Sequence, residues 1–251
     1  MNKLNINELN QYVNENIVLF HEKRINCIQN LTLEKLIKKN PYLFKAKNIE
    51  TANDLISGFL EAFLSSSEEK IFGDFLEGLA VFIAGETRNG HKSAATGIDL
   101  EIVENSEHHL ISIKSGPNWG NSSQITKLIQ DFNQARKKVV QQNPQINVKS
   151  ILGICYGKTR TTLSTKGYWK LVGQNFWFFI SGEKDLYTNI IEPIGFEAKR
   201  HNDKFLKDKN NFINKMTKNF IEKYCNNNGE INWAILVEQN SGNFDLDTIA
   251  I

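Results

Sequence analysis

The sequence predicts an α/β fold, in which helices flank a mixed central β-sheet and a helical region lies at the N-terminus. Two observations predict this class. Apolar residues recur at helical spacing in the first third of the chain, and from about residue 97 they recur at every second position. Helical and extended patterns then follow one another to the C-terminus, which favours a sheet covered by helices over an all-helical or all-β protein.

Residues 1–65 are predicted to form a helical region that packs on the remainder of the chain, residues 66–251. Within it, segments 31–39 and 51–64 both carry apolar residues at helical spacing. Pro41 follows the first of these segments and is expected to end it, because proline cannot continue a helix without disrupting its hydrogen bonds.

Segment 68–84 has the strongest helical pattern in the sequence. A broad apolar stripe runs along it, formed by Ile71, Phe72, Phe75, Leu76, Leu79, Phe82 and Ile83. Glu77 lies off this stripe, flanked by Gly73 and Gly78. A glycine inside a helix costs about 1 kcal/mol relative to alanine, so the two glycines predict that the sheet or a DNA backbone passes close to the helix at this point.

Two alternating segments after residue 97 predict a β-hairpin. A two-residue turn at 105–106 pairs residues whose numbers sum to 211, and one face of the hairpin then consists of Ile and Leu and is expected to face the core. The other face gathers four polar side chains: Asp99, Glu101, Ser112 and Lys114. Opposed side chains lie about 5 Å apart at Cβ, so Lys114 is expected to converge on the carboxylates. His108 and His109 adjoin the turn and are expected to be exposed, with a metal role as the alternative.

The second half of the chain continues the α/β pattern. A helix is predicted over 122–142, because Asn121 and Gln124 are spaced as in a capping box. The apolar run 148–156 predicts a central strand. Three further elements complete the prediction: a strand or a buried helix over 173–180, a helix over 210–225, and a late strand over 231–238.

The composition is that of an ordinary globular chain of 251 residues, with a net charge of +2 that neither requires nor excludes nucleic acid. Cys27, Cys155 and Cys225 are far apart and lack the spacing of a zinc site or a disulfide framework. The N-terminus does not resemble a signal peptide, and no apolar run is long enough to cross a bilayer. We therefore expect a cytoplasmic protein.

The polar face of the predicted hairpin fits metal-assisted hydrolysis of a phosphodiester. Carboxylates are the oxygen ligands that Mg²⁺ prefers. The ion neutralises charge on the phosphodiester and makes hydroxide available near neutral pH. A lysine beside it can hold the attacking water and stabilise the charge that develops on phosphorus. Spacing alone leaves a second interpretation open, a salt bridge on the solvated face of a two-stranded ribbon.

The motif GIDLEI…ISIK, residues 97–102 and 111–114, resembles the active-site hairpin of the PD-(D/E)xK nucleases. SGPNWGNSSQ, residues 115–124, and GQNFWFFISGEKDLYTNIIEPIG, residues 173–195, are similar to a type II restriction endonuclease branch of that superfamily. The resemblance covers most of residues 65–200. It implies a restriction-endonuclease-like fold for the α/β domain.

The resemblance also implies roles for individual residues. Asp99 matches the metal-binding aspartate, Lys114 matches the catalytic lysine, and the backbone carbonyl of Ile113 is expected to face the metal. Ser112 departs from the motif, which has Glu or Asp at this position, and a hydroxyl is a much weaker Mg²⁺ ligand than a carboxylate. Another acid must then supply the missing charge, and two remain candidates: Glu101, two residues after Asp99, and Glu77, on the preceding helix.

The loop after Lys114 is predicted to grip a DNA backbone beside the cut, since its glycines allow close approach and a helix N-terminus attracts phosphate. The side chains expected to contact DNA are Ser115, Asn118, Trp119, Asn121, Ser122, Ser123 and Gln124. Trp119 fits a core anchor equally well, and Gln124 fits a capping side chain. Lys158 and Arg160, in a loop after the central strand, are predicted to contact phosphates or base edges.

These observations predict a Mg²⁺-dependent type II restriction endonuclease that cleaves double-stranded DNA at a specific site. A homodimer is expected, because a protein two-fold axis matches a palindromic site, and the resemblance implies a cognate DNA methyltransferase in the same host. Three alternatives stay open. They are a DNA repair or junction-resolving nuclease of the same fold, a catalytically inactive DNA-binding module, which Ser112 would suit, and a structural protein whose hairpin charges are merely solvated.

Overall fold

A computed structural model describes residues 1–242 and 244, and these form two compact units. Unit 1 consists of Met1–Phe20 and Phe72–Ala198, and unit 2 of His21–Ile71 and the described residues from Lys199 onward. Two long helices, α1 (Ile6–Gln29) and α4 (Ala52–Arg88), contribute residues to both units. The sequence had predicted two helices, over 51–64 and 68–84, where α4 is continuous. That prediction was wrong because Ser66 and Ser67 donate their hydroxyls to the carbonyls four residues earlier, which accommodates a polar run inside a helix.

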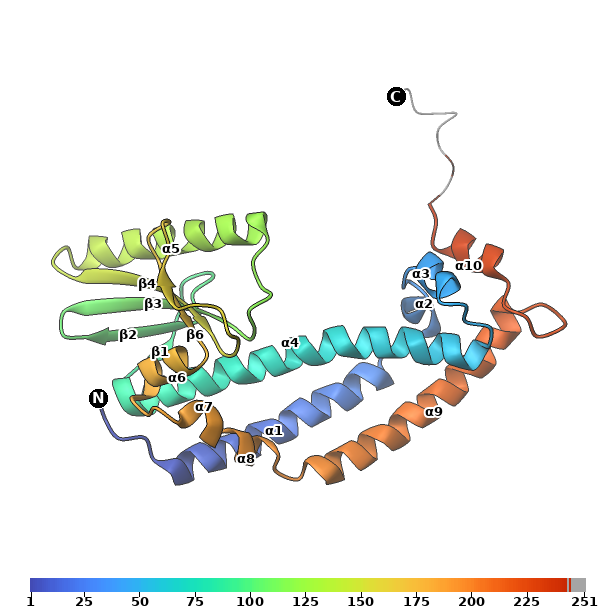
Figure 1. The fold of residues 1–251 in the computed structure, drawn as a ribbon, viewed down its shortest axis with the longest axis horizontal. Coiled ribbons are helices and arrows are strands. Elements are labelled where there is room, and N and C mark those ends of the chain that lie inside the picture. Colours follow the sequence, from blue (N-terminus) through green and yellow to red (C-terminus); the bar gives the residue numbers. More distant parts are fainter. Residues whose placement is uncertain (243, 245–251) are drawn as a thin grey trace. The chain divides into compact units, whose positions relative to one another are not determined.

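Unit 1 contains a six-stranded mixed sheet in the order β1-β2-β3-β4-β6-β5 (Figure 1). Its strands are β1 (His91–Lys92), β2 (Leu100–Glu104), β3 (Glu107–Lys114), β4 (Asn147–Ile154), β5 (Thr162–Leu163) and β6 (Trp169–Val172). Strands β3, β4 and β6 are mutually parallel, whereas β1, β2 and β5 pair antiparallel with their neighbours. The predicted fold class, a mixed sheet flanked by helices, is confirmed.

The β2–β3 hairpin has the predicted register. Leu100 pairs with Ile111 and Glu104 pairs with Glu107, so that paired numbers sum to 211. The turn residues Asn105 and Ser106 have φ angles of 48° and 60°. Positive φ at both central residues gives the turn the twist that a two-residue hairpin requires.

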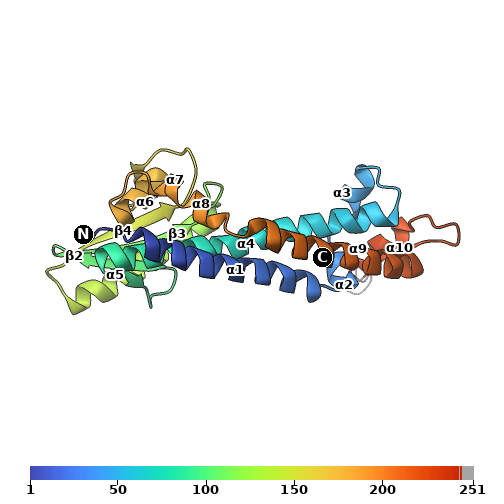
Figure 2. The ribbon, with the colours of Figure 1, turned by 90° about the horizontal axis from the view of Figure 1, so that it is seen from below.

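Helices cover both faces of this sheet (Figure 1). Helix α5 (Ser122–Gln142) packs on one face, where Leu128 and Phe132 meet Leu110 and Leu152. The unit 1 parts of α1 and α4 lie along the other face, together with α6 (Gln174–Ser181) (Figure 2). The face that was expected to be polar is therefore largely buried, and its polar side chains remain accessible only toward the end of the hairpin remote from the turn.

Helices in the second half of unit 1 follow local signals in the sequence. The capping box of α5 is confirmed, because Asn121 accepts from the backbone N–H of Gln124 and Gln124 accepts from that of Asn121, each at 3.0 Å. Residues 173–180, for which strand and helix were both open, form α6, which ends at Gly182 with φ 74°. Two short helices follow, α7 (Leu186–Asn189) and α8 (Ile191–Ile194).

Unit 2 has an apolar core of its own. The unit 2 parts of α1 and α4 share it with α2 (Leu33–Leu36), α3 (Pro41–Ala46), α9 (Ala198–Tyr224) and α10 (Trp233–Gln239). The strand predicted over 231–238 was wrong, because this segment forms α10. Asn232 caps the helix by accepting from the N–H of Ile235 at 3.2 Å, and Leu236 is its buried residue. In the described part of the chain, no helix is both long enough and apolar enough to cross a membrane.

The histidines beside the hairpin turn are not exposed as expected. His109 is 4% exposed, and its ring packs edge-on against Phe179. His108 is held by Glu101, with Nε2 2.6 Å from Oε2. Burial, and then the charge of Arg88, lower the pKa of His109 to about 4. The imidazole is therefore neutral in the folded protein over most of the acidic range.

This buried histidine makes stability depend on pH. A histidine with a lowered pKa in the folded state binds its proton more readily after unfolding, so its contribution is complete above about pH 6.5 and is lost as pH falls toward 4. As the pH falls from 6.5 to 4, the free energy of unfolding should decrease in both the wild-type protein and His109→Leu. The decrease should be larger in the wild-type protein, by at most about 3 kcal/mol. Thermal unfolding at a series of pH values measures the difference, and parallel profiles would contradict the assignment. His21, in unit 2, also has its pKa lowered to about 4, so the variant reduces the slope without removing it.

Candidate active site

Asp99 lies immediately before β2, at a local irregularity of the sheet. Its backbone N–H donates to the carbonyl of Ile111 at 2.9 Å, although Ile111 is the residue paired with Leu100. Two consecutive residues therefore oppose one partner, as in a β-bulge, which re-aims a side chain. The Asp99 carboxylate turns toward β3, where Oδ2 accepts the N–H of Ile113 at 2.5 Å and the hydroxyl of Ser112 at 3.3 Å.

Lys114, the last residue of β3, converges on this carboxylate. Its Nζ lies 3.8 Å from Oδ2 of Asp99 and 5.5 Å from the centroid of the Trp119 ring. The two charged side chains are 28% and 20% exposed, so solvent still reaches both. An ion pair this long and this accessible contributes about 1 kcal/mol or less to stability. The ammonium group is consequently close to the carboxylate and free to interact with a further ligand.

Glu77 reaches the same region from helix α4. Burial raises the pKa of its carboxyl, the negative charge of Asp99 raises it further, and Lys92 and Lys114 lower it. Lys92, on the edge strand β1, places Nζ 3.5 Å from Oε1 of Glu77. A hollow of about 550 Å³ beside Glu77 opens this carboxylate to solvent. The Glu77 and Asp99 carboxylates therefore repel one another, and a cation near both would be stabilised by their negative charges.

Glu101 is held elsewhere, although it too was a candidate acid. One carboxylate oxygen accepts the hydroxyl of Ser93 at 2.5 Å, and the other lies 2.6 Å from Nε2 of His108. Both oxygens are thus engaged by side chains of the neighbouring residues Ser93 and His108. Of the two candidates, Glu77 is the acid whose pKa is affected by the charges of Asp99 and Lys114.

The backbone carbonyl of Ile113 points toward the same edge. In an extended strand the N–H and C=O of one residue point the same way, and the N–H of Ile113 donates to Asp99. A continued hairpin ladder would bring the N–H of Ile98 to this carbonyl, but Ile98 donates to Ala95 instead, at 3.2 Å. The ladder therefore ends before Ile113, and its carbonyl lies on the side of β3 where the Asp99 carboxylate accepts from the N–H of the same residue.

This donor set suits a hard divalent ion. Among the described residues, no three His, Cys, Asp or Glu side chains gather closely enough to form a metal site by themselves. Mg²⁺ does not require such a cage, because it is commonly bound by one or two carboxylates together with water and substrate phosphates. Asp99, Glu77 and the Ile113 carbonyl match that pattern, and all three are oxygen donors.

The loop between β3 and α5 lies next to Lys114, and most of its predicted DNA-contacting side chains are exposed. Asn118, Asn121, Ser122, Ser123 and Gln124 are exposed, and Ser115 is partly exposed. Gln124 uses its side chain as the cap described above, and Trp119 packs partly on the core beneath α5. The alternative roles predicted for these residues, a helix cap for Gln124 and a core anchor for Trp119, are therefore present in the structure. A Cβ added to Gly73 would lie 3.7 Å from the side chain of Ser115, which is ordinary contact, whereas a Cβ added to Gly78 would come within 2.9 Å of the Tyr12 hydroxyl, so only the second helix glycine is explained by a close neighbour.

Lys158 and Arg160 lie in the loop that follows β4. Residues 156–160 are all exposed, and the segment returns to the sheet only at β5. Strands β3 and β4 are parallel, so this loop and the Lys114 loop leave the sheet at the same edge. The two predicted contact regions therefore flank the carboxylates.

Two charged residues near the site were not anticipated. Asp131, on α5, is 6% exposed and pairs with Lys127 at 2.8 Å. It lines a hollow of about 380 Å³ together with Ser112 and Lys114. A signal was present in the sequence, because Asp131 interrupts the apolar stripe of Leu128, Phe132 and Ala135. Lys92 had no such signal, since β1 is only two residues long.

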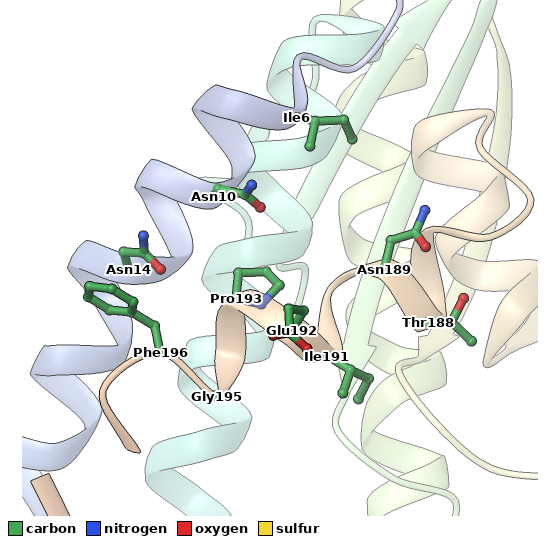
Figure 3. Close-up of a pocket in the computed structure, with 10 residues that line it drawn as sticks. All are labelled: Ile6, Asn10, Asn14, Thr188, Asn189, Ile191, Glu192, Pro193, Gly195 and Phe196. Atoms are coloured by element: carbon green, nitrogen blue, oxygen red, sulfur yellow. The ribbon is translucent and has the colours of Figure 1, made fainter. Parts of the chain in front are cut away.

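Another hollow in unit 1, of about 670 Å³, has a different chemistry. It lies between α1 and the α7–α8 segment, where Asn10 and Asn14 face Pro193 and Phe196 (Figure 3). Of its ten lining residues, Glu192 alone is ionisable. It therefore lacks the paired carboxylates and lysine that distinguish the edge near β3.

A comparison with known families assigns the chain. The family model described as type II restriction endonuclease EcoO109I matches residues 7–202. The chain belongs to this family. The match spans the hairpin, the loop after it, α5 and the segment 173–195, so it includes every stretch on which the resemblance was based. No curated protein matches the chain.

Membership of the EcoO109I family supports an endonuclease that acts on double-stranded DNA. The restriction-endonuclease-like fold expected from the sequence agrees with both the match and the mixed sheet. The family assignment does not identify individual catalytic groups. Their assignment depends on the geometry at the edge of β2 and β3.

Proposed function

We propose that the chain is a Mg²⁺-dependent type II endonuclease that hydrolyses phosphodiester bonds at a specific site in double-stranded DNA. The observation that supports it most strongly is the ion pair between Asp99 and Lys114, both of which are partly exposed, with Glu77 close enough to interact electrostatically with each of them. The family match supplies the reaction class, and these three residues supply groups suited to that reaction.

In the proposed mechanism, Asp99, Glu77 and the Ile113 carbonyl would hold Mg²⁺. When bound, the ion neutralises the phosphodiester and lowers the pKa of coordinated water. Lys114 orients the attacking water and stabilises the added negative charge on the phosphate in the transition state. The attacking water gives a proton to solvent as its oxygen bonds to phosphorus, and the bond from phosphorus to the leaving sugar oxygen breaks. The leaving oxygen takes a proton from solvent.

Ser112 favours a second candidate, a DNA-binding module without catalysis. Its hydroxyl donates to Asp99 and occupies the position where the motif has a carboxylate. Glu77 argues against this candidate, because a helical acid beside Asp99 restores the second negative charge. Nicking of plasmid DNA by the purified protein would exclude the inactive module, and cleavage confined to branched or damaged DNA would favour a repair or junction-resolving enzyme.

Partners follow from the proposed reaction. Cutting both strands of a palindromic site calls for two copies of the catalytic edge, so we propose a homodimer on DNA. A host that carries such an enzyme must protect its own sites, so we also propose a cognate DNA methyltransferase. Sedimentation with and without duplex DNA tests the first proposal.

Removal of the metal is expected to abolish cleavage. Purified protein incubated with a large DNA in Mg²⁺ should give discrete fragments, because only a specific site limits the number of cuts. The same reaction in EDTA should leave the DNA intact, and excess Mg²⁺ should restore the fragments. Gel analysis and sequencing of the ends measure both effects.

Each departure from this pattern has a distinct meaning. Fragments that persist in EDTA would contradict the metal dependence. A continuous smear in Mg²⁺ would contradict site specificity while leaving an endonuclease. Intact DNA in every condition, with binding retained, would favour the inactive module.

A further inference from the structure

Tyr156 occupies a position that the proposed mechanism does not use. It follows the central strand β4 by two residues and is 59% exposed, although the apolar run 148–156 had placed it inside a strand. A single exposed tyrosine is ordinary on a protein surface. The location of Tyr156 is unusual, because it lies close to the proposed catalytic lysine. Lys114 pairs with Ile154 in the parallel sheet, and both strands end at the same edge, just before Tyr156.

The backbone at Tyr156 is fastened to the loop that carries Lys114. The N–H of Cys155 donates to the carbonyl of Lys114 at 2.9 Å, and the N–H of Tyr156 donates to that of Ser115 at 3.2 Å. From the other side, the indole N–H of Trp177 donates to the carbonyl of Cys155 at 2.8 Å. The segment is therefore held at both flanks and keeps a fixed position relative to Lys114.

The side chain of Tyr156 lies over Gly116. A Cβ added to Gly116 would come within 2.6 Å of the Tyr156 hydroxyl oxygen, closer than real Cβ contacts allow. Gly157 has φ 136°, and a Cβ there would meet the ring of Pro117 at 2.9 Å. Glycines in both loops thus permit a close approach that directs the phenol back toward the Lys114 loop. In the described part of the chain, the Tyr156 hydroxyl has no hydrogen-bond partner, so its donor is available to a ligand.

Other chemistry at this position is weak. Burial raises the pKa of the adjacent Cys155 thiol to about 12, so it remains protonated and is a poor nucleophile. The loop continues from Tyr156 into the exposed cations Lys158 and Arg160. The Tyr156 hydroxyl thus lies between Lys114 on one side and the two cations on the other. Such a row of groups suits a long anion that contacts all of them, and the DNA backbone is such an anion.

We propose that Tyr156 is a further DNA-contacting residue, which donates its hydroxyl to a phosphate next to the scissile one and rests its ring on the adjoining sugar. Tyrosine is one of the side chains that proteins use to contact DNA phosphates and so fix their register on the duplex. The contact would align the DNA with Lys114 before cleavage, because the two residues are joined through their backbones. This inference rests on the proposed function.

The test compares Tyr156→Phe and Tyr156→Ala with Tyr42→Ala, which removes a tyrosine that is 67% exposed in unit 2. The probe is a fluorescently labelled duplex that carries the site mapped from wild-type fragments, with Ca²⁺ replacing Mg²⁺ so that binding can be followed apart from cleavage. We expect Tyr156→Phe to weaken binding about tenfold, since a hydrogen bond to a charged group is lost. Tyr156→Ala should weaken it further, and Tyr42→Ala should bind as wild type does.

The salt dependence of binding separates this role from a general electrostatic one. Tyr156 is neutral and displaces no counterion, so its variants should weaken binding while the slope of log affinity against log salt stays unchanged. Wild-type affinity in Tyr156→Phe and Tyr156→Ala would overturn the inference even if the wild-type protein cleaves DNA. A wild-type protein that neither binds nor cleaves the duplex would overturn the proposed function, and the inference with it. Far-UV circular dichroism establishes that Tyr156→Phe, which keeps the ring, remains folded.

Discussion

Lys114→Ala is expected to lower the rate of DNA cleavage by about three orders of magnitude, while duplex affinity falls by far less. The ammonium group lies 3.8 Å from Asp99 and remains partly exposed, so it can act on water and phosphate together. Removing one preorganised donor from an active site lowers the rate by about 10²–10³-fold. Loss of one phosphate contact among many affects binding much less. Single-turnover cleavage and anisotropy in Ca²⁺ measure the two quantities separately.

Two further variants make this result interpretable. Lys138→Ala removes an exposed lysine from α5 and should cleave as wild type does. Lys114→Arg keeps the positive charge but replaces a compact ammonium with a planar guanidinium, and it should not recover the rate. Full activity in Lys114→Ala would remove this residue from the mechanism. Equal loss of binding and cleavage would instead indicate a structural or purely electrostatic role.

The hairpin that carries this lysine was predictable because its signals are local. A two-residue period on both sides of a two-residue turn fixes the register, since a shift of one residue would turn every apolar side chain to the opposite face. The start of α5 was predictable because its signal is local too, since the capping box involves only Asn121 and Gln124. The proximity of Asp99 to Lys114 was therefore expected from sequence, although a bulge at Asp99, which no local signal predicted, sets the direction of the carboxylate.

Predictions failed where the deciding contacts are not local. The run INWAILVE at 231–238 is too short and too uniformly apolar for its period to distinguish a strand from a helix, and the cap at Asn232 decides for α10. His109 was expected to be exposed because it adjoins a turn, yet Phe179 from α6 covers it. In both cases the sequence near the residue was compatible with either outcome.

The identity of the second acid was also beyond the sequence. Glu101 follows Asp99 by two residues, whereas Glu77 is distant in sequence and depends on how α4 packs on the sheet, so the sequence left both acids open. Ser93 and His108 then engage Glu101 from outside the motif. No periodic pattern encodes those two contacts, and they favour the helical acid.

Glu77→Gln is accordingly expected to reduce cleavage by about a hundredfold at low Mg²⁺ and to raise the Mg²⁺ concentration needed for half-maximal rate. Glutamine keeps the size of the side chain and removes the charge that would balance the ion. Glu101→Gln is the matched variant, because it makes the same chemical change to the other candidate. Its cleavage and Mg²⁺ dependence should stay close to wild type, since its oxygens bind Ser93 and His108. Cleavage rates across a Mg²⁺ titration measure both.

The comparison of these two variants decides which carboxylate replaces the one absent at Ser112. If Glu101→Gln loses the greater part of the activity and Glu77→Gln does not, then the Glu101 side chain must leave Ser93 and His108 when the metal binds. If both variants retain full activity, Asp131 becomes the remaining buried acid near Lys114, because it lines the hollow that also contains Ser112. A selective effect of Glu77→Gln on the Mg²⁺ requirement is the outcome that the geometry supports, since Glu77 shares an electrostatic environment with Asp99 and Lys114. The second carboxylate of the site would then come from helix α4 and not from strand β3, where the motif has it, and the negative charge near the metal would be the same.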